Sequence, residues 1–541
     1  MSTFVFLFRY FIYLIKLYSY NLSYLSMHQQ KIDEDLRNIA KGNVLSDDWS
    51  KKIYSVDASE FAILPSTIIQ VKDKEDISNV CKYAYSKNLA ITGRGAGTGL
   101  LGQSLTTGIS IDFTKYMNKI IELENNYVMV QPGIVKAVLD KELKKRGKFL
   151  PPDPSSSNFC TIGGMIANNS SGIHALGYGN TIDFLDGIEI IYSNGFIESL
   201  LNQVHDIHDS AKRESHSVRT NKINQLFKLF SSDNLEYISW KFPKVTKNSC
   251  GYRIDTLIDN SKRYLPHKIF ASSEGTLGIT TLAKFRILDL PLYKSLMVIG
   301  FDNLLKAVKS VPTILTMRPT SLELLDYSVL CYEQLVGNKS NYKFNNNNGG
   351  TLLFVEFAGD DFVQIELKIQ LCKEKLDGYG EILAITSDNV SCERIWSARK
   401  NALNNVMKLT VGSRKPISLI EDTIVNPYYL YDYTLFLLKI YKKYKLDYIF
   451  YGHAGNGNLH TRPVIDTASS IYKDLIGSLA TEVFSKVYEL SGSITAEHGD
   501  GISRTKYISQ MYGNTIFDIF KKIKFIFDPT NIMNPGKKVI Q

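Results

Sequence analysis

The stretch GRGAGTGLLG, residues 93–102, restricts the folds open to this chain. Its last six residues match the GxGxxG pattern of a Rossmann dinucleotide-binding turn. Such a turn opens a crossover helix, and a crossover between parallel strands needs about a dozen residues or more. Only six residues separate Gly102 from the next apolar run, residues 109–113. We therefore predict a glycine-lined loop between two close strands, and not a Rossmann unit.

The surrounding sequence predicts α/β structure. Residues 75–87 carry apolar side chains at helical spacing, between the extended runs 67–71 and 89–92. Glycines at alternate positions 93, 95, 97 and 99 suit a nest of backbone N–H groups around a pyrophosphate, although a tight turn is the alternative. Small residues also fill residues 151–172 and 272–279, which leaves room for a flat ligand. Three such segments indicate one extended ligand.

Length and charge set the class of protein. A chain of 541 residues is too long for one core and suggests two or three domains. The net charge of +9 is spread along the chain, so we expect no nucleic-acid partner. An anionic small substrate or an anionic membrane face would account for the same net positive charge. The six cysteines lack metal-ligand spacing, which indicates reduced core thiols and excludes an iron–sulfur cluster held by this chain.

Residues 1–26 are apolar but contain Arg9 and Lys16. Each cation costs about 2.5–3.5 kcal/mol at the centre of a membrane helix, which disfavours a span. An interfacial anchor, a targeting segment, or an upstream start before Met27 remain as interpretations. We expect a cytoplasmic protein or one peripheral to the inner face of a membrane. The polar stretch 200–233 is expected to be a surface insertion, and residues 341–350 a low-complexity loop.

Two histidine segments in the second half predict a site. Residues 451–463, YGHAGNGNLHTRP, and residues 496–501, AEHGDG, each place histidine beside glycines after an apolar run, which predicts strand ends. If residues 454–457 form a hairpin turn, His453 and His460 converge, and Glu497 adds a carboxylate. Two histidines and one carboxylate are a ligand set for Zn, Mn or Fe. The alternative is that the histidines only hydrogen-bond a substrate.

Eight motifs in order resemble one known family. They are GRGAGTGLLG, PPDPSSSNFCTIGGMIANNSSG, KNSCGY, SSEGTLGI, IEDTIVNP, YGHAGNGNLHTRP, EHGDG and FDPTNIMNPGK. Together they resemble the FAD-linked oxidases of the vanillyl-alcohol oxidase fold, and more narrowly the D-lactate, glycolate and D-2-hydroxyglutarate dehydrogenases. The resemblance implies an α+β protein with a two-subdomain FAD-binding domain (residues 27–290), an antiparallel-sheet cap (291–490) and a C-terminal segment returning to the FAD domain (491–541).

The resemblance assigns FAD binding to the small-residue segments. No histidine or cysteine lies in residues 94–101, so we expect non-covalent FAD. The motifs KNSCGY and IEDTIVNP are most similar to large bacterial members fused to an iron–sulfur region, whose cysteines this sequence lacks. The assigned residues are Gly93, Arg94, Gly95, Ala96, Gly97, Thr98, Gly99, Pro152, Asp153, Ser156, Thr161, Gly163, Gly164, Asn168, Ser171, Gly172, Glu274, Gly275, Gly278, Ile279 and Asn534.

The family chemistry assigns roles in the second half. Oxidation of a D-2-hydroxy acid, D-lactate or D-2-hydroxyglutarate, moves hydride to flavin while the hydroxyl loses its proton. We expect His498 to be the base, with an unperturbed pKa near 6.5, and Arg399 to grip the substrate carboxylate, a surface arginine being the alternative. Lys415 and Arg462 are candidates for a second anionic group. Metal-binding members are similar at the two histidines of the turn and at the glutamate, whereas Asn456 stands where many relatives have aspartate.

Two functions follow from these assignments. The first is an FAD-dependent D-2-hydroxy-acid dehydrogenase that passes electrons to a quinone, a cytochrome, a flavoprotein or a separate iron–sulfur protein. The second is a flavin-binding electron-transfer subunit of a larger oxidase-like complex, without a substrate site. The histidine and glutamate residues favour the first, because a pure relay needs no such group.

Overall fold

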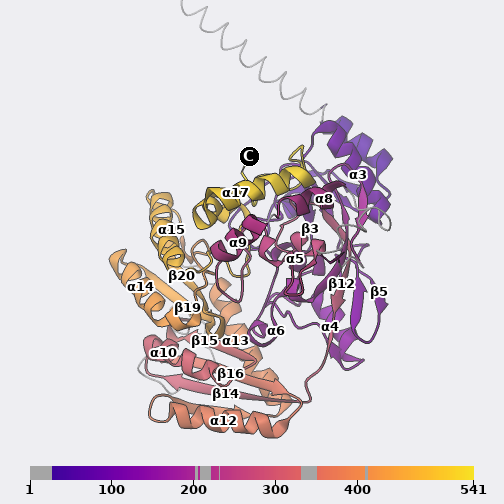
Figure 1. The fold of residues 1–541 in the computed structure, drawn as a ribbon. Coiled ribbons are helices and arrows are strands. Elements are labelled where there is room, and N and C mark those ends of the chain that lie inside the picture. Colours follow the sequence, from indigo (N-terminus) through magenta and orange to yellow (C-terminus); the bar gives the residue numbers. More distant parts are fainter. Residues whose placement is uncertain are drawn as a thin grey trace, which may run out of the picture.

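The structure is a computed structural model (Figure 1). It describes Met27 and residues 29–201, 205–206, 221–230, 232–329, 350–408 and 412–540. The expected N-terminal extension, the low-complexity loop up to residue 349 and most of the polar stretch 200–233 lie outside the described residues. Among the described residues, no helix is both long and apolar enough to cross a membrane.

The first half of the chain contains two large sheets and, among the described residues, two small two-stranded ones. A four-stranded sheet has the order β1-β2-β4-β3, in which β2, β4 and β3 are parallel. A five-stranded antiparallel sheet has the order β5-β6-β12-β8-β9. The strands are β1 (Asn43–Leu45), β2 (Thr67–Gln70), β3 (Ile91–Arg94), β4 (Ile109–Asp112), β5 (Ile120–Leu123), β6 (Tyr127–Val130), β8 (Leu185–Ile191), β9 (Ile197–Ser199) and β12 (Ile279–Arg286).

The glycine stretch is a loop, as predicted. Strands β3 and β4 pair directly, and residues 95–108 between them contain no helix. The predicted helix also forms: α3 (Lys74–Lys87) begins at Asp73, whose side chain accepts a hydrogen bond from the backbone N–H of Asp76, and ends at Asn88 with φ of 51°. Its apolar face packs against the four-stranded sheet. A Rossmann crossover is therefore absent from this segment.

The second half contains a seven-stranded antiparallel sheet, in the order β17-β14-β16-β15-β19-β20-β18. Successive side chains of a strand point to opposite faces. On one face, Met297, Leu324 and Val355 pack with helices α10 and α12. The strands and helices are β14 (Tyr293–Phe301), α10 (Leu304–Leu315), β15 (Ser321–Asp326), β16 (Thr351–Gly359), α12 (Phe362–Leu376), β17 (Glu381–Thr386), α13 (Asn389–Lys408), β18 (Arg414–Pro416), α14 (Leu430–Lys443), β19 (Asp447–His453), β20 (Asn458–Asp466) and α15 (Tyr472–Glu489).

The opposite face of this sheet packs on α13. Leu296, Val298 and Phe354 belong to a separate apolar cluster there, and Trp396 of α13 packs against it. The polar residues described below lie on the same face. The sheet therefore has a purely structural side and a side that carries chemistry.

The end of the chain returns to the first half (Figure 1). After α17 (Ile508–Phe527), the backbone N–H of Asn534 donates to the carbonyl of Ile91 at 2.7 Å, beside strand β3. Lys538 is buried and forms ion pairs with Asp500 at 2.8 Å and Glu274 at 3.3 Å. Distant parts of the sequence thus support the glycine-rich segments.

One local prediction is wrong. Residues 493–495 were expected to form a strand, but only an isolated bridge between Ile424 and Ser493 is present. The segment 496–501 is held by side-chain hydrogen bonds instead of a sheet. Of the six cysteines, the five that the structure describes are buried thiols, and Cys331 lies outside the described residues.

Candidate active site

Strands β19 and β20 form the predicted hairpin. A short 3-10 turn, residues 454–456, and Gly457 connect them. Gly457 has φ of +75°, and a Cβ atom on it would lie 1.9 Å from the carbonyl oxygen of Val425, so a larger residue would clash. Tyr451 pairs with His460 across the hairpin. Because His453 lies two residues after Tyr451, both histidines point to the same face of the sheet.

Three histidines converge on one carboxylate oxygen. The Nε2 atoms of His453, His460 and His498 lie 3.0, 3.4 and 3.9 Å from Oε1 of Glu497. The rings of His460 and His498 are stacked, with centroids 4.9 Å apart. We call these four residues the histidine cluster. The structure thus brings together all four residues that the sequence indicated for metal binding and base catalysis.

The other ring nitrogens are held by buried carboxylates. Nδ1 of His453 lies 2.7 Å from Glu323, and Nδ1 of His460 and His498 lie 2.9 and 2.7 Å from the two oxygens of Glu421. A carboxylate at Nδ1 favours the tautomer that leaves the Nε2 lone pair free. This is the arrangement of metal-ligating histidines, so the donor set fits a divalent cation.

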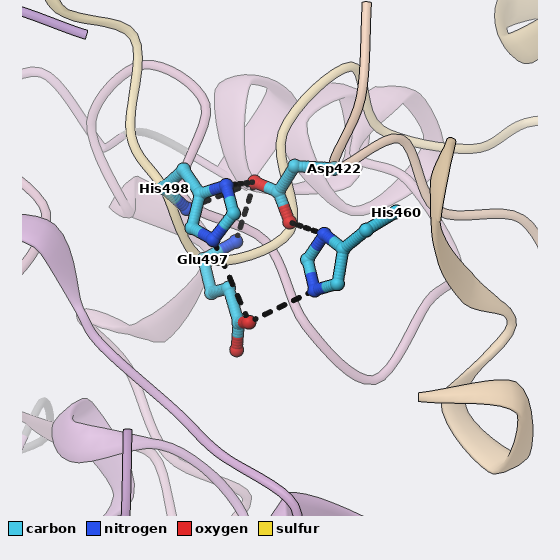
Figure 2. Close-up of side chains that lie close together, drawn as sticks. All are labelled: Asp422, His460, Glu497 and His498. Carbon is cyan, nitrogen blue, oxygen red and sulfur yellow. Dashed lines mark hydrogen bonds and ion pairs between the residues drawn. The ribbon is translucent and has the colours of Figure 1, made fainter. Parts of the chain in front are cut away.

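Asp422 lies on the Nδ1 side of His460 and His498, whereas Glu497 lies on the Nε2 side (Figure 2). Asp422 is near enough to join His460, Glu497 and His498 as a donor, since one atom of each lies within 4.8 Å of the others. However, one oxygen of Asp422 accepts hydrogen bonds from the backbone N–H groups of residues 496, 497 and 498. We therefore assign Asp422 to holding the loop.

Lys247 and Ser171 occupy the second oxygen of Glu497. The ammonium of Lys247 is fully buried and lies 3.0 Å from Oε2, and the Ser171 hydroxyl donates to the same atom. Burial would raise the pKa of Glu497, but Lys247 and His453 outweigh it and hold that pKa well below its usual value. Glu497 is therefore ionised, with Oε1 turned to the three histidines.

The environment of His498 differs from the expectation. Burial lowers its pKa, but Asp422 and Glu421 outweigh this effect and raise the pKa to about 9. The expected unperturbed value near 6.5 is therefore wrong for this protein without a bound metal. The cause is the pair of buried carboxylates behind the ring, which the sequence did not indicate.

The cationic candidates are placed unequally. Arg399 is buried and forms an ion pair with Glu323, and Arg462 donates to the Tyr451 hydroxyl at 3.0 Å. Both arginines line the main cavity, but Lys415 does not: its nearest carboxylate is Glu60, at 3.8 Å. The structure therefore does not bring Lys415 to the substrate region.

Asn456 also stays outside the cluster. Its side-chain nitrogen donates to the Thr246 hydroxyl at 2.8 Å, and the residue is buried. In the part of the chain that the structure describes, the ligand set forms without it.

A cavity of about 920 Å³ joins the glycine loop to the histidine cluster. A smaller one of about 80 Å³ lies against the first half. Together they are lined by every residue assigned to FAD except Pro152 and Asn534. The Asn534 amide donates to the carbonyls of Gln103 and Glu274, so it ties the loops together. One continuous space therefore connects the two predicted sites.

The glycine loop is shaped for close approach. A Cβ atom on Gly95 would lie 2.1 Å from Oγ1 of Thr161, and Gly97 has φ of +68°. The guanidinium of Arg94 donates to the backbone carbonyls of Tyr54 and Val56, so this side chain supports the loop. A flat ligand can therefore lie against backbone atoms here.

Two family models match this chain. The FAD binding domain matches residues 65–200, and the C-terminal domain of FAD linked oxidases matches residues 290–538. The chain belongs to the FAD-linked oxidases. The FAD-binding match and the glycine-rich cavity together identify FAD as the cofactor of this family member.

Several curated proteins are similar to this FAD-linked oxidase. D-2-hydroxyglutarate dehydrogenase of Pseudomonas putida is 28% identical over 93% of this chain and 51% of its own length. D-2-hydroxyglutarate dehydrogenase of Escherichia coli is 29% identical over 89% of this chain and 49% of its own. The chain thus spans about half the length of these relatives. Glycolate oxidase subunit GlcD of Bacillus subtilis is 28% identical over 90% of this chain and 91% of its own.

Solved structures show the same fold. Substrate-bound p-cresol methylhydroxylase superposes with a TM-score of 0.64 at 15% identity, covering 95% of this chain and 97% of that one. At this identity the likeness concerns the fold alone. The α+β architecture with two FAD subdomains and an antiparallel cap is thereby confirmed.

Sequence reasoning missed several residues around the site. Glu323 interrupts the apolar strand β15, and Glu421 with Asp422 lies in the motif IEDTIVNP, to which no role was assigned. Lys247 begins the motif KNSCGY. His174 also lines the cavity and bonds to Asp153 and Glu356 at 2.6 and 2.9 Å. A charged residue inside an apolar strand was the one available signal.

Proposed function

We propose that this protein is an FAD-dependent dehydrogenase that oxidises a D-2-hydroxy acid to the 2-oxo acid and passes the electrons to a non-NAD acceptor. The convergence of the three Nε2 atoms on Glu497, in the cavity shared with the glycine loop, carries this proposal. A protein that only transfers electrons through its flavin would not need these three histidines and the glutamate. The family membership and the names of the relatives support it.

Arg399 orients the substrate. The planar guanidinium of Arg399 suits a carboxylate, and Glu323 holds it by one nitrogen while leaving other donors available. Tyr451 and Arg462 lie beside it in the cavity wall. When its carboxylate is bound at this wall, the substrate points its 2-hydroxyl toward the histidine cluster.

The proton of the substrate hydroxyl goes to His498. Glu421 binds Nδ1 of this ring, so Nε2 is the atom that faces the substrate. Bound FAD supplies the hydride acceptor, which leaves binding, orientation and proton transfer to the protein. The buried surroundings of the cluster exclude water from this step.

The residues that would hold a divalent cation, Zn, Mn or Fe, are His453 and His460 through Nε2 and Glu497 through Oε1. Such a cation would supply a Lewis acid, and its charge would disfavour protonation of His498. Elemental analysis of dialysed protein tests the site. We expect about one equivalent of metal in the wild type and none in Glu497→Gln; equal contents would refute the assignment.

Anaerobic flavin reduction tests the function. We expect D-lactate or D-2-hydroxyglutarate to bleach the flavin absorbance, and the L-enantiomers to leave it unchanged. Precipitation with acid is expected to leave a colourless pellet, because FAD is bound without a covalent bond. A flavin that no 2-hydroxy acid bleaches would refute the dehydrogenase.

The second candidate is a flavin-binding electron-transfer subunit. One observation favours it: the chain matches 91% of a relative named as a subunit of glycolate oxidase. In that case the flavin would be reduced by a protein partner and not by a 2-hydroxy acid. The same anaerobic experiment separates the two candidates. Its acceptor arm, with a quinone analogue, cytochrome c, a flavoprotein or an iron–sulfur protein, identifies the route by which electrons leave.

A further inference from the structure

Most cations that line the main cavity already have partners. Lys136 pairs with Asp140 at 2.5 Å, Arg399 with Glu323, and Arg462 bonds to Tyr451. His174 lies between two carboxylates, one from each half of the molecule. A committed cation costs more to recruit for a ligand, because its first partner is left unpaired. A second anionic group of the substrate, beyond the carboxylate assigned to Arg399, is therefore expected to bind elsewhere.

Three lysines of the cavity lining form no ion pair with the residues that the structure describes: Lys144, Lys294 and Lys400. Lys144 is exposed and lies at the end of α4 (Lys136–Lys144), on the FAD-binding half. Lys294 and Lys400 are half-buried and belong to the cap. Neither cap lysine has a carboxylate within salt-bridge distance among the described residues, although the charge of Lys294 helps to lower the pKa of Glu356.

Both cap lysines line the same cavity as Arg399, the residue expected to bind the substrate carboxylate. Lys400 follows Arg399 directly on α13. Lys294 pairs with Ala358, so it is the diagonal neighbour of Glu356 on the face of the sheet that packs on α13. Glu356 in turn accepts a hydrogen bond from Trp396, one helical turn before Lys400. The lysines thus flank one wall of the cavity.

We propose that Lys294 and Lys400 bind the second carboxylate of a 2-hydroxydicarboxylate. This inference rests on the proposed function and names its substrate class. It replaces Lys415, which lies outside the cavity lining, and Arg462, which is committed to Tyr451 and lies 3.8 Å from Glu421.

Other charges on this wall have to be counted. Glu393 also lines the cavity and is exposed, and the His174 imidazole is outnumbered by Asp153 and Glu356. These carboxylates repel an anionic tail unless a cation lies between. The uncommitted lysines provide that cation, which is why their removal should affect a dicarboxylate far more than a monocarboxylate.

The test compares two substrates with FAD-loaded full-length protein. KM and the rate of anaerobic flavin reduction are measured for D-2-hydroxyglutarate and D-lactate, in Lys294→Met, Lys400→Met and the double variant. Loss of a hydrogen bond to a charged group weakens binding about 10- to 100-fold. We expect KM for D-2-hydroxyglutarate to rise by this factor in the double variant, and KM for D-lactate to change by less than about twofold.

Lys144→Met is the matched control, because it removes the same charge from another wall of the same cavity. We expect it to leave both substrates unchanged. An equal rise for both substrates, an equal effect of Lys144→Met, or wild-type flavin that is reduced by D-lactate but not by D-2-hydroxyglutarate would overturn the inference and leave the proposed function standing. Flavin that no 2-hydroxy acid reduces would overturn both. The flavin-to-protein ratio of each variant verifies that it is folded.

Discussion

Two histidines show how differently the two regions of this molecule are built. His267, in the FAD-binding half, is buried and has no hydrogen-bond partner at Nδ1, and burial together with Lys268 lowers its pKa to about 3. His498, in the histidine cluster, is partly buried, but Asp422 and Glu421 raise its pKa to about 9. Without a bound metal, the same side chain is therefore neutral in one region and stabilised as a cation in the other.

The contrast extends to the surrounding residues. The FAD-binding region forms its site from glycines and small side chains, so that the cofactor can lie against the backbone. The histidine cluster lies among buried charges of both signs, such as Glu323 with Arg399 and Lys247 with Glu497. The FAD-binding region depends on the absence of side chains, whereas the histidine cluster depends on the positions of charged groups. Variants in the first region should therefore lose flavin, and variants in the second should lose catalysis.

The largest expected effect is on catalysis alone. His498→Ala removes the proposed proton acceptor, and general acid–base catalysis contributes about 100- to 10,000-fold. We expect flavin reduction by the D-2-hydroxy acid to slow by that factor in stopped-flow measurements. The flavin-to-protein ratio should stay unchanged, because the ring contacts Glu421 and not the glycine loop. Unimpaired flavin reduction would remove His498 from this role.

In the FAD-binding region we expect the opposite result, which is loss of flavin with the histidine cluster unchanged. In Gly95→Ala the new methyl group would lie 2.1 Å from the Thr161 hydroxyl oxygen, so the loop has to shift. Overpacking of this kind costs about 1–3 kcal/mol, which corresponds to FAD binding weakened by about 5- to 150-fold. Absorbance of the purified protein measures the flavin lost, and metal analysis should give the same metal content as in the wild type.

Gly477→Ala is the matched control for this variant. Gly477 lies in α15, where a Cβ atom would meet nothing within 4 Å. We expect full flavin content and a small gain in stability from the better helix propensity of alanine. If both glycine variants lose flavin equally, the close approach at Gly95 is not the cause.

The same contrast explains which features could be predicted from the sequence alone. The glycine loop and the hairpin of His453 and His460 were predictable because glycine spacing and turns are determined by a few neighbouring residues. Glu323 contacts His453 from 130 positions away, and Lys247 reaches Glu497 across 250. Such pairings depend on how strands and loops pack, so no local pattern indicates them. The position of Lys415 outside the cavity lining, 3.8 Å from Glu60, was unpredictable for the same reason.

The two regions are joined at His174, and breaking that link should have a moderate effect. Its ring bonds to Asp153 in the first half and to Glu356 in the cap, and Glu356 also accepts from Trp396 at 2.9 Å. We expect His174→Asn and Trp396→Phe to be non-additive in thermal stability, with a coupling of about 0.5–3 kcal/mol, as for residues of one hydrogen-bond network. Trp240→Phe, at a side chain that is 71% exposed, should add independently to His174→Asn. Additive losses for His174 and Trp396 would show that they do not act as one link.

The smallest expected effect returns to His267 and has a defined sign. Its pKa is about 3 in the folded protein and near 6.5 when unfolded, so above pH 6.5 both states are neutral and pH has no effect through this group. Below pH 6.5 the unfolded state binds the extra proton, and the free energy of unfolding falls, by about 1.4 kcal/mol at pH 5.5. Urea denaturation of wild type and His267→Asn at pH 7.5 and 5.5 isolates this contribution from other titrating groups. We expect the wild type to lose about 1.4 kcal/mol more than the variant over this range. Equal losses would mean that His267 reaches a proton-accepting partner in solution, and the contrast with His498 would then disappear.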